Sequence, residues 1–160
     1  LGIYRDLVAI FDGAPRYDRP RAIALAGSAA GAAKAPRYDL ILHLIDLFLA
    51  RLARTGAGHP PQTQAAPGEA DLFARLAPDV WSARRWAERA AKGAETLYSH
   101  AINLDPAALI LDIIIKINET ASARAALPAN HKSPTAIVTW ISRISTASLR
   151  MSLHAPPRPG

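Results

Sequence analysis

Residues 102–118 read INLDPAALILDIIIKIN, a segment that is apolar on almost every side if it forms a helix. Asp105 is a suitable N-cap and Pro106 suits the first helical position, so the pattern predicts a helix from residue 106 to about Ala123. A soluble helix of this kind normally lies at the centre of a core or at an assembly interface. The rest of the chain therefore has to explain what covers this helix.

The apolar side chains of this helix fall on two sides. One side carries Ile110, Ile113, Ile114 and Ile117, and another carries Leu111 and Ile115, four residues apart. A narrow polar strip lies between parts of the two, where the acid and the base are four apart and can pair: Asp112 and Lys116. One bundle can bury the first side, whereas burying both requires neighbours on two sides. The candidate interface residues are Leu109, Ile110, Leu111, Ile113, Ile114, Ile115 and Ile117, and the sequence leaves open which side faces inward.

Five further segments show helical periodicity. They span residues 3–11, about 18–31, 38–54, 69–77 and 80 to about 100. No segment before residue 125 alternates apolar and polar residues with the period of two that marks a strand. The sequence therefore predicts an all-α fold, a bundle of about six helices over residues 1–125.

The segment YDLILHLIDLFLARLAR, residues 38–54, has the strongest helical pattern. Its expected apolar face consists of Leu40, Ile41, Leu44, Ile45, Phe48, Leu49 and Leu52. Asp39, His43 and Asp46 lie on the opposite stripe at a spacing that metal ligands also use. Such a stripe is usually just the solvated face of an amphipathic helix, and we expect no metal site there.

The pattern of a phosphate-binding loop is also incomplete in this chain. Gly27, Gly31 and Lys34 resemble it faintly, but Lys34 precedes Ala35 rather than Ser or Thr, and no strand comes before it. No serine stands in a nucleophile motif, and the histidines are scattered. We therefore expect no catalytic residue, no cofactor and no small-molecule substrate.

A basic run offers an alternative function. Arg84, Arg85, Arg89 and Lys92 share one predicted helix with two tryptophans, which favours a nucleic-acid contact. Glu88 and Glu95 dilute the run, and solvated helix faces often look like this. A helical nucleic-acid-binding domain using residues 84–92 therefore stands as the second reading.

Composition limits the compartment and the nature of the charge. The chain has 160 residues with a net charge of +6 and no cysteine, and no uncharged apolar run approaches the ~18 residues of a membrane span. No signal peptide is recognisable, so a cytoplasmic protein without membrane contact is expected. Four basic residues and no acid fall in residues 126–160, which leaves a net charge of only +2, from 15 basic and 13 acidic residues, in residues 1–125.

Residues 126–160 differ in kind from the body. They hold eight of the sixteen Ser and Thr residues and end in HAPPRPG, and the helical periodicity is lost. The composition predicts an irregular or disordered tail. Out-of-frame or read-through sequence would look the same.

Three segments together resemble a known family: IYRDLVAIF at residues 3–11, YDLILHLIDLFLARLAR at residues 38–54 and NLDPAALILD at residues 103–112. This combination resembles the C-terminal domain of the delta-prime subunits of bacterial DNA polymerase III, in their alphaproteobacterial form. The resemblance covers about residues 3–123, and NLDPAALILD with the apolar helix after it is its most specific part. These are packing motifs rather than catalytic ones.

The resemblance implies a non-catalytic assembly domain of a DNA replication clamp loader. In that family the helical domain joins those of the other clamp-loader subunits in a ring called the collar, and DNA is met only through the complex. The family's ATPase-like module, arginine finger and zinc-binding cysteines belong to a part outside this sequence, so none of those residues is carried over. The family pattern ends near residue 123, before the tail.

Overall fold

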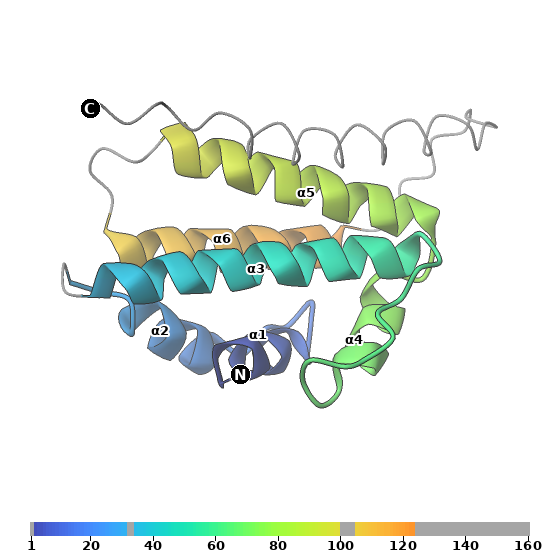
Figure 1. The fold of residues 1–160 in the computed structure, drawn as a ribbon, viewed down its shortest axis with the longest axis horizontal. Coiled ribbons are helices and arrows are strands. Elements are labelled where there is room, and N and C mark those ends of the chain that lie inside the picture. The colour runs from blue at the N-terminus through green and yellow to red at the C-terminus, as the bar shows by residue number, and fades with distance from the viewer. Residues whose placement is uncertain (1, 32–33, 100–104, 124–160) are drawn as a thin grey trace, which may run out of the picture. The chain divides into compact units, whose positions relative to one another are not determined.

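Six helices make up the part of the chain that the structure describes, which is residues 2–31, 34–99 and 105–123 of a computed structural model (Figure 1). In chain order they are α1 (Gly2–Phe11), α2 (Arg19–Gly27), α3 (Ala35–Gly56), α4 (Glu69–Leu76), α5 (Val80–Ser99) and α6 (Pro106–Ser122). All six belong to one compact unit, Leu1–Ala125. The predicted all-α class is thus confirmed. The tail of residues 126–160 lies outside the described residues.

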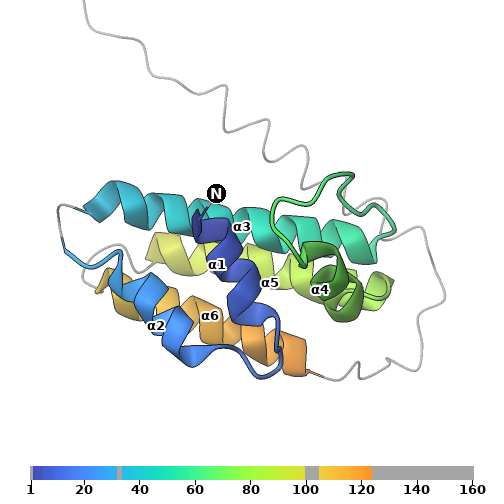
Figure 2. The same cartoon turned by 90° about the horizontal axis from the view of Figure 1, so that it is seen from below.

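The longest helix, α3, runs along one side of the bundle. It packs most extensively against α5, and α1 and α4 also contact it, while α2 lies against α1 and α6. Figure 2 shows α3 and α6 along opposite sides of the bundle. The arrangement explains why α3 and α6 each have one buried side.

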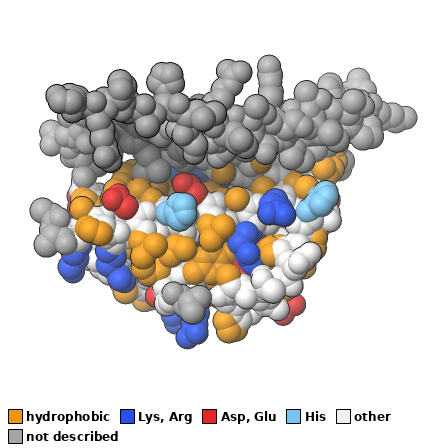
Figure 3. Space-filling view, in the orientation of Figure 1, with side chains coloured by type: hydrophobic (Ala, Val, Ile, Leu, Met, Phe, Trp, Pro, Cys, Tyr) orange, Lys and Arg blue, Asp and Glu red, His pale blue; other side chains and the backbone are white. Residues whose placement is uncertain are grey.

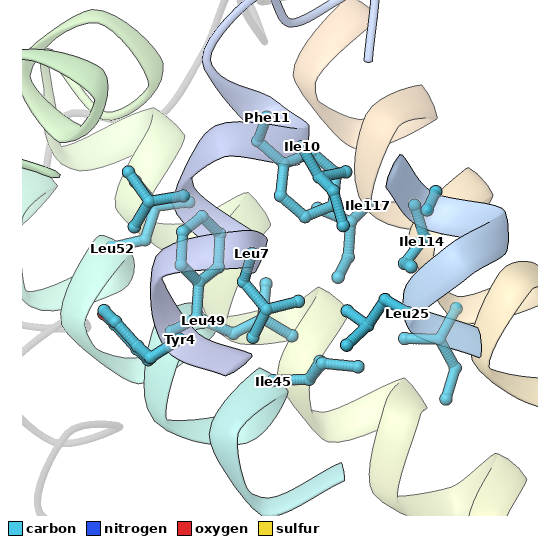
Figure 4. Packing of buried hydrophobic residues seen from close by; sticks show 14 of the residues in the cluster. Tyr4, Leu7, Ile10, Phe11, Leu25, Ile45, Leu49, Leu52, Ile114 and Ile117 are labelled. Atoms are coloured by element: carbon cyan, nitrogen blue, oxygen red, sulfur yellow. The ribbon is translucent and has the colours of Figure 1, made fainter. Parts of the chain in front are cut away.

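The core is centred on a group of aromatic rings joined by aliphatic side chains. The centroid of the Phe48 ring lies 5.5 Å from the centroid of the Phe11 ring, 5.3 Å from that of the Phe73 ring and 6.3 Å from that of the Tyr4 ring. Figure 4 shows Leu7, Ile10 and Phe11 of α1 between Leu49 of α3 and the side chains of Ile114 and Ile117 of α6. One apolar core therefore connects α1, α3, α4 and α6.

The predicted helix starts are confirmed by hydrogen bonds at three caps. Asp18 accepts from the amide of Arg21 at 3.0 Å, and Asp105 accepts from two amides at the start of α6. Asp79 accepts from the amide of Ser82 at 2.7 Å and so caps α5. These caps satisfy amide groups that the helix itself leaves without a partner.

Two sequence expectations about helix faces and ends need correction. Leu40 was expected on the apolar face of α3, but it is 47 % exposed. The buried row is Ile41, Ile45, Phe48, Leu49 and Leu52, because the helices that cover α3 reach only one side of it. The second correction concerns α2, which ends at Gly27 and not near Gly31.

The end of α3 approaches the start of α5 very closely at Gly56. A Cβ atom at this position would lie 2.7 Å from the carbonyl oxygen of Asp79 and 3.0 Å from the Cβ of Ala83. Both contacts are shorter than side chains normally tolerate, so the crossing of the two helices depends on glycine here.

Candidate assembly surface

The structure separates the two apolar sides of α6. Ile110 and Ile114 have no exposed surface, and the rest of that side is also buried: Leu109, Ile113 and Ile117. Leu111 is only partly buried, and Ile115 is 42 % exposed. The second side of the helix is therefore only partly covered in this unit, because Leu111 packs against the core while Ile115 is exposed. We call Leu111 and Ile115 the α6 surface.

The expected polar strip borders this surface. Lys116 Nζ lies 2.6 Å from Asp112 Oδ2, and both side chains keep substantial solvent contact. An exposed pair of this kind contributes only about 0.3–0.5 kcal/mol to helix stability. The Asp112–Lys116 pair therefore borders the α6 surface but does not cover its apolar side chains.

The neighbouring helix α2 adds another exposed isoleucine. Ile23 is 59 % exposed, although α2 packs against α6 and buries Ala22, Leu25 and Ala26. Figure 2 shows the two helices side by side. The sequence analysis did not single out Ile23. Its exposure could have been inferred from its position, because it does not share the spacing of the buried residues of α2.

The basic run on α5 is largely engaged within the protein. Arg84 Nε lies 3.0 Å from Glu88 Oε1, and Arg85 donates to the carbonyl oxygen of Ala123 at the end of α6. Arg89 is partly buried, and Lys92 is exposed but has a partner. Arg84 and Arg85 are therefore engaged within the protein, and Lys92 is not free.

The stripe of Asp39, His43 and Asp46 lies on the outer side of α3. Within the described ranges, no three His, Asp or Glu side chains are placed to hold a metal ion. Partial burial raises the pKa of Asp46, and the nearby His43 opposes that rise. All three residues are exposed on α3.

A buried carboxylate that sequence reasoning missed ties three parts of the bundle together. Glu69, only 1 % exposed, accepts from the Tyr4 hydroxyl at 2.5 Å and from Arg51 Nε at 2.7 Å and Nη2 at 2.9 Å. The amide of Ala65 also donates to it at 2.6 Å, and Arg51 reaches the carbonyl of Thr63 at 2.8 Å. We call these five residues the Glu69 network.

The electrostatics of the Glu69 network follow from this arrangement. Burial works against ionisation of Glu69, but hydrogen bonds from Arg51, Tyr4 and Ala65 outweigh it and hold its pKa below the ordinary value. Burial and the adjacent carboxylate raise the pKa of Tyr4 far above the usual range for tyrosine. Each oxygen of Glu69 accepts two hydrogen bonds, which is typical of a structural role.

One open depression lies between α1, α2 and the start of α3. Its volume is about 440 Å³, and its lining is Asp6, Asp18, Pro20, Arg21, Ala24, Leu25, Ser28 and Arg37. Arg21 Nη1 lies 3.2 Å from Asp6 Oδ1, and Arg21 Nε lies 3.5 Å from Asp18 Oδ2. Arg37 Nε donates a hydrogen bond to Ser28 Oγ. These charges therefore compensate one another within the depression.

Comparison with protein-family models, with curated proteins and with solved structures finds no match to this chain. Among the described helices, none is long and apolar enough to cross a membrane. The features that bear on function are thus the apolar surfaces, the basic helix and the resemblance in sequence.

Proposed function

We propose that this chain is a non-catalytic assembly domain of a DNA replication clamp loader, corresponding to the C-terminal domain of a DNA polymerase III delta-prime subunit. Its partners would be the other clamp-loader subunits in the cytoplasm, with DNA met only through the complex. The proposal includes no cofactor. It is supported by the three segments that resemble the family and by the arrangement of α6.

The observation that carries the proposal is the partly covered side of α6. Ile115 is 42 % exposed on a helix whose opposite side, around Ile114, is fully buried. A partner that covered this side of α6 would remove the exposed surface of Ile115 from water, which favours association. The α6 surface is therefore the part of the bundle that we assign to assembly.

The test uses matched substitutions on the two sides of α6. Ile115→Asp should leave the helical circular dichroism of the chain unchanged, because the new carboxylate stays in contact with water. Leu111→Asp, at a partly buried position that packs on the core, should lower the stability but leave the chain folded. Both should abolish co-purification with the other clamp-loader subunits. Ile114→Asp is the control, and it should unfold the domain because an unpaired charge is buried, at a cost of about 4 kcal/mol or more.

Three results would count against the proposal. Folded Ile115→Asp and Leu111→Asp variants that still enter the clamp-loader complex as the original chain does would remove the α6 surface from assembly. Failure of the original chain to join that complex would remove the clamp-loader assignment itself. Unfolding by all of the Asp substitutions would show that α6 is purely internal.

A further inference from the structure

The outer face of α3 carries exposed leucines far from the α6 surface. Leu40 is 47 % exposed and Leu47 is 42 % exposed, and Leu44 between them is only partly buried. Figure 3 shows hydrophobic side chains gathered over the face on which α3 lies, with charged side chains around them. This face is opposite to the side along which α6 runs in Figure 2.

The exposed residues of this face have the spacing of a helix-pairing seam. The α3 seam consists of Leu40, His43, Leu47, Ala50 and Arg54, all exposed, at successive intervals of three and four. Alternation of three and four keeps side chains in line along one helix and lets them pack against a second helix. The seam extends over about 21 Å, or four turns. It therefore fits another helix better than a loop or a strand.

One edge of the α3 seam is acidic. Asp39 and Asp46 are seven residues apart, each directly before a seam leucine, and both are exposed. Within the described residues, neither forms an ion pair with a lysine or an arginine. At the other edge, Arg51 is already held by Glu69. A helix lying on the seam would thus meet unpaired negative charge along one flank.

This distribution of charge argues against a second copy of the chain as the occupant. Antiparallel pairing of two α3 seams would bring like edges together, with Asp39 opposite Asp46 of the other copy, and like charges repel. Parallel pairing would turn the acidic edge toward Leu44 and Arg51, and the guanidinium of Arg51 is occupied by Glu69. A partner helix with basic residues on one flank would instead place Lys or Arg beside Asp39 and Asp46.

We propose that the α3 seam docks an amphipathic helix of a partner protein, with apolar residues at intervals of three and four and with Lys or Arg seven residues apart on one flank. The leucines of the seam, Leu40 and Leu47, supply the apolar contact area. The pairing of the two basic residues with Asp39 and Asp46 sets the direction of the bound helix. The site is separate from the α6 surface. Both can therefore be occupied together.

The experiment is selection from a phage-displayed library of helical peptides with leucines at seam spacing and randomised flanks, against the full chain. Recovered peptides should carry Lys or Arg seven residues apart. Selection against the Asp39→Lys, Asp46→Lys double variant should instead recover Asp or Glu at those places. By fluorescence anisotropy, the double variant should bind the first set about tenfold more weakly, from the loss of two exposed charge pairs.

Seam and non-seam variants decide where the peptide binds. Leu47→Asp should abolish binding of the peptide. If Leu47→Asp does not fold, Ala50→Arg serves in its place, because position 50 is exposed and arginine is compatible with a helix. The added arginine should abolish binding by repelling the basic residues of the peptide. Ile115→Asp should bind the peptide as the original chain does, whatever its effect on assembly. Recovered peptides without a basic preference, or binding that survives both seam changes, would overturn the proposal, as would a dimer of the chain that Leu47→Asp dissociates.

Discussion

At the scale of single residues, the caps and the Glu69 network bond partners at very different distances along the chain. Asp18 and Asp105 could be predicted as caps, because a cap bonds amides two or three positions further along the chain. Glu69 could not be predicted as a buried residue. Its partners Tyr4 and Arg51 are 65 and 18 positions away, and only the packing of α1, α3 and α4 brings them together.

The Glu69 network should make stability depend on acid. The pKa of Glu69 is lower in the folded chain than the ordinary 4.5, so the unfolded chain takes up its proton first as the pH falls. The stabilisation is complete above about pH 4.5 and is lost as the pH falls through the lower, folded-state value. Urea unfolding at pH 7 and pH 3 should show a large loss of stability in the original chain and a smaller one in Glu69→Gln.

At pH 7 itself, Glu69→Gln should lower the free energy of unfolding by about 2 kcal/mol, because Arg51 loses its counter-charge in a largely buried place. Tyr4→Phe is the matched control. It removes one hydrogen bond but keeps the charge pair, so it should cost about 1 kcal/mol at pH 7. Because the Tyr4 hydroxyl helps to lower the pKa of Glu69, the difference between the two pH values should shrink, but less than in Glu69→Gln. Equal acid sensitivity of the original chain and Glu69→Gln would contradict this account of the Glu69 network.

At the scale of helices, periodicity predicted which elements exist but not how far their faces are covered. The pattern of α3 placed Leu40 with the core, yet the helices that cover α3 leave Leu40 exposed. The two apolar sides of α6 could be recognised in sequence, but their assignment to inside and outside could not. How much of a helix face is buried depends on the position and length of the neighbouring helices. The periodicity of one helix alone does not contain that information.

The junction of α3 and α5 offers a test at this scale. Gly56→Ala should destabilise the chain by about 1–3 kcal/mol, because the added methyl group would press on the backbone of α5. The expected contact is the 2.7 Å approach to the carbonyl oxygen of Asp79. The measurement is the midpoint of thermal unfolding followed by circular dichroism.

Gly93→Ala is the matched control for Gly56→Ala. Gly93 lies inside α5, and a Cβ there would meet nothing within 4 Å. Alanine is the better helix former, so this change should stabilise the chain by up to about 1 kcal/mol. Opposite signs for the two substitutions are expected. If Gly56→Ala also stabilises, helix propensity outweighs the close approach, and the crossing does not require glycine.

At the scale of the whole molecule, the all-α bundle followed from sequence because six amphipathic segments without strand periodicity have few other ways to bury their apolar sides. The connections made by Arg85 and Glu69 across the bundle did not follow, since they depend on the order in which helices pack. The proposed function depends on which surface a partner covers. Charge offers an independent way to choose between assembly and nucleic-acid binding.

Residues 1–125 carry a net charge of only +2, while the full chain carries +6. In addition, Arg84 pairs with Glu88, and Arg85 bonds the end of α6. A chain ending at Ala125 should therefore bind duplex DNA only weakly at physiological salt, and the full chain should bind better with a steeper salt dependence. The measurement is fluorescence anisotropy of a labelled duplex over a series of salt concentrations.

The double variant Arg84→Ala, Arg85→Ala, made in the chain ending at Ala125, separates the two functions. It should leave the weak affinity for DNA unchanged, because few free cations are removed, and it should lower thermal stability through the lost bond to Ala123. Tight binding by the shorter chain, falling steeply with salt and lost in the double variant, would instead identify α5 as a nucleic-acid surface. The basic helix would then replace the α6 surface as the functional centre of the molecule.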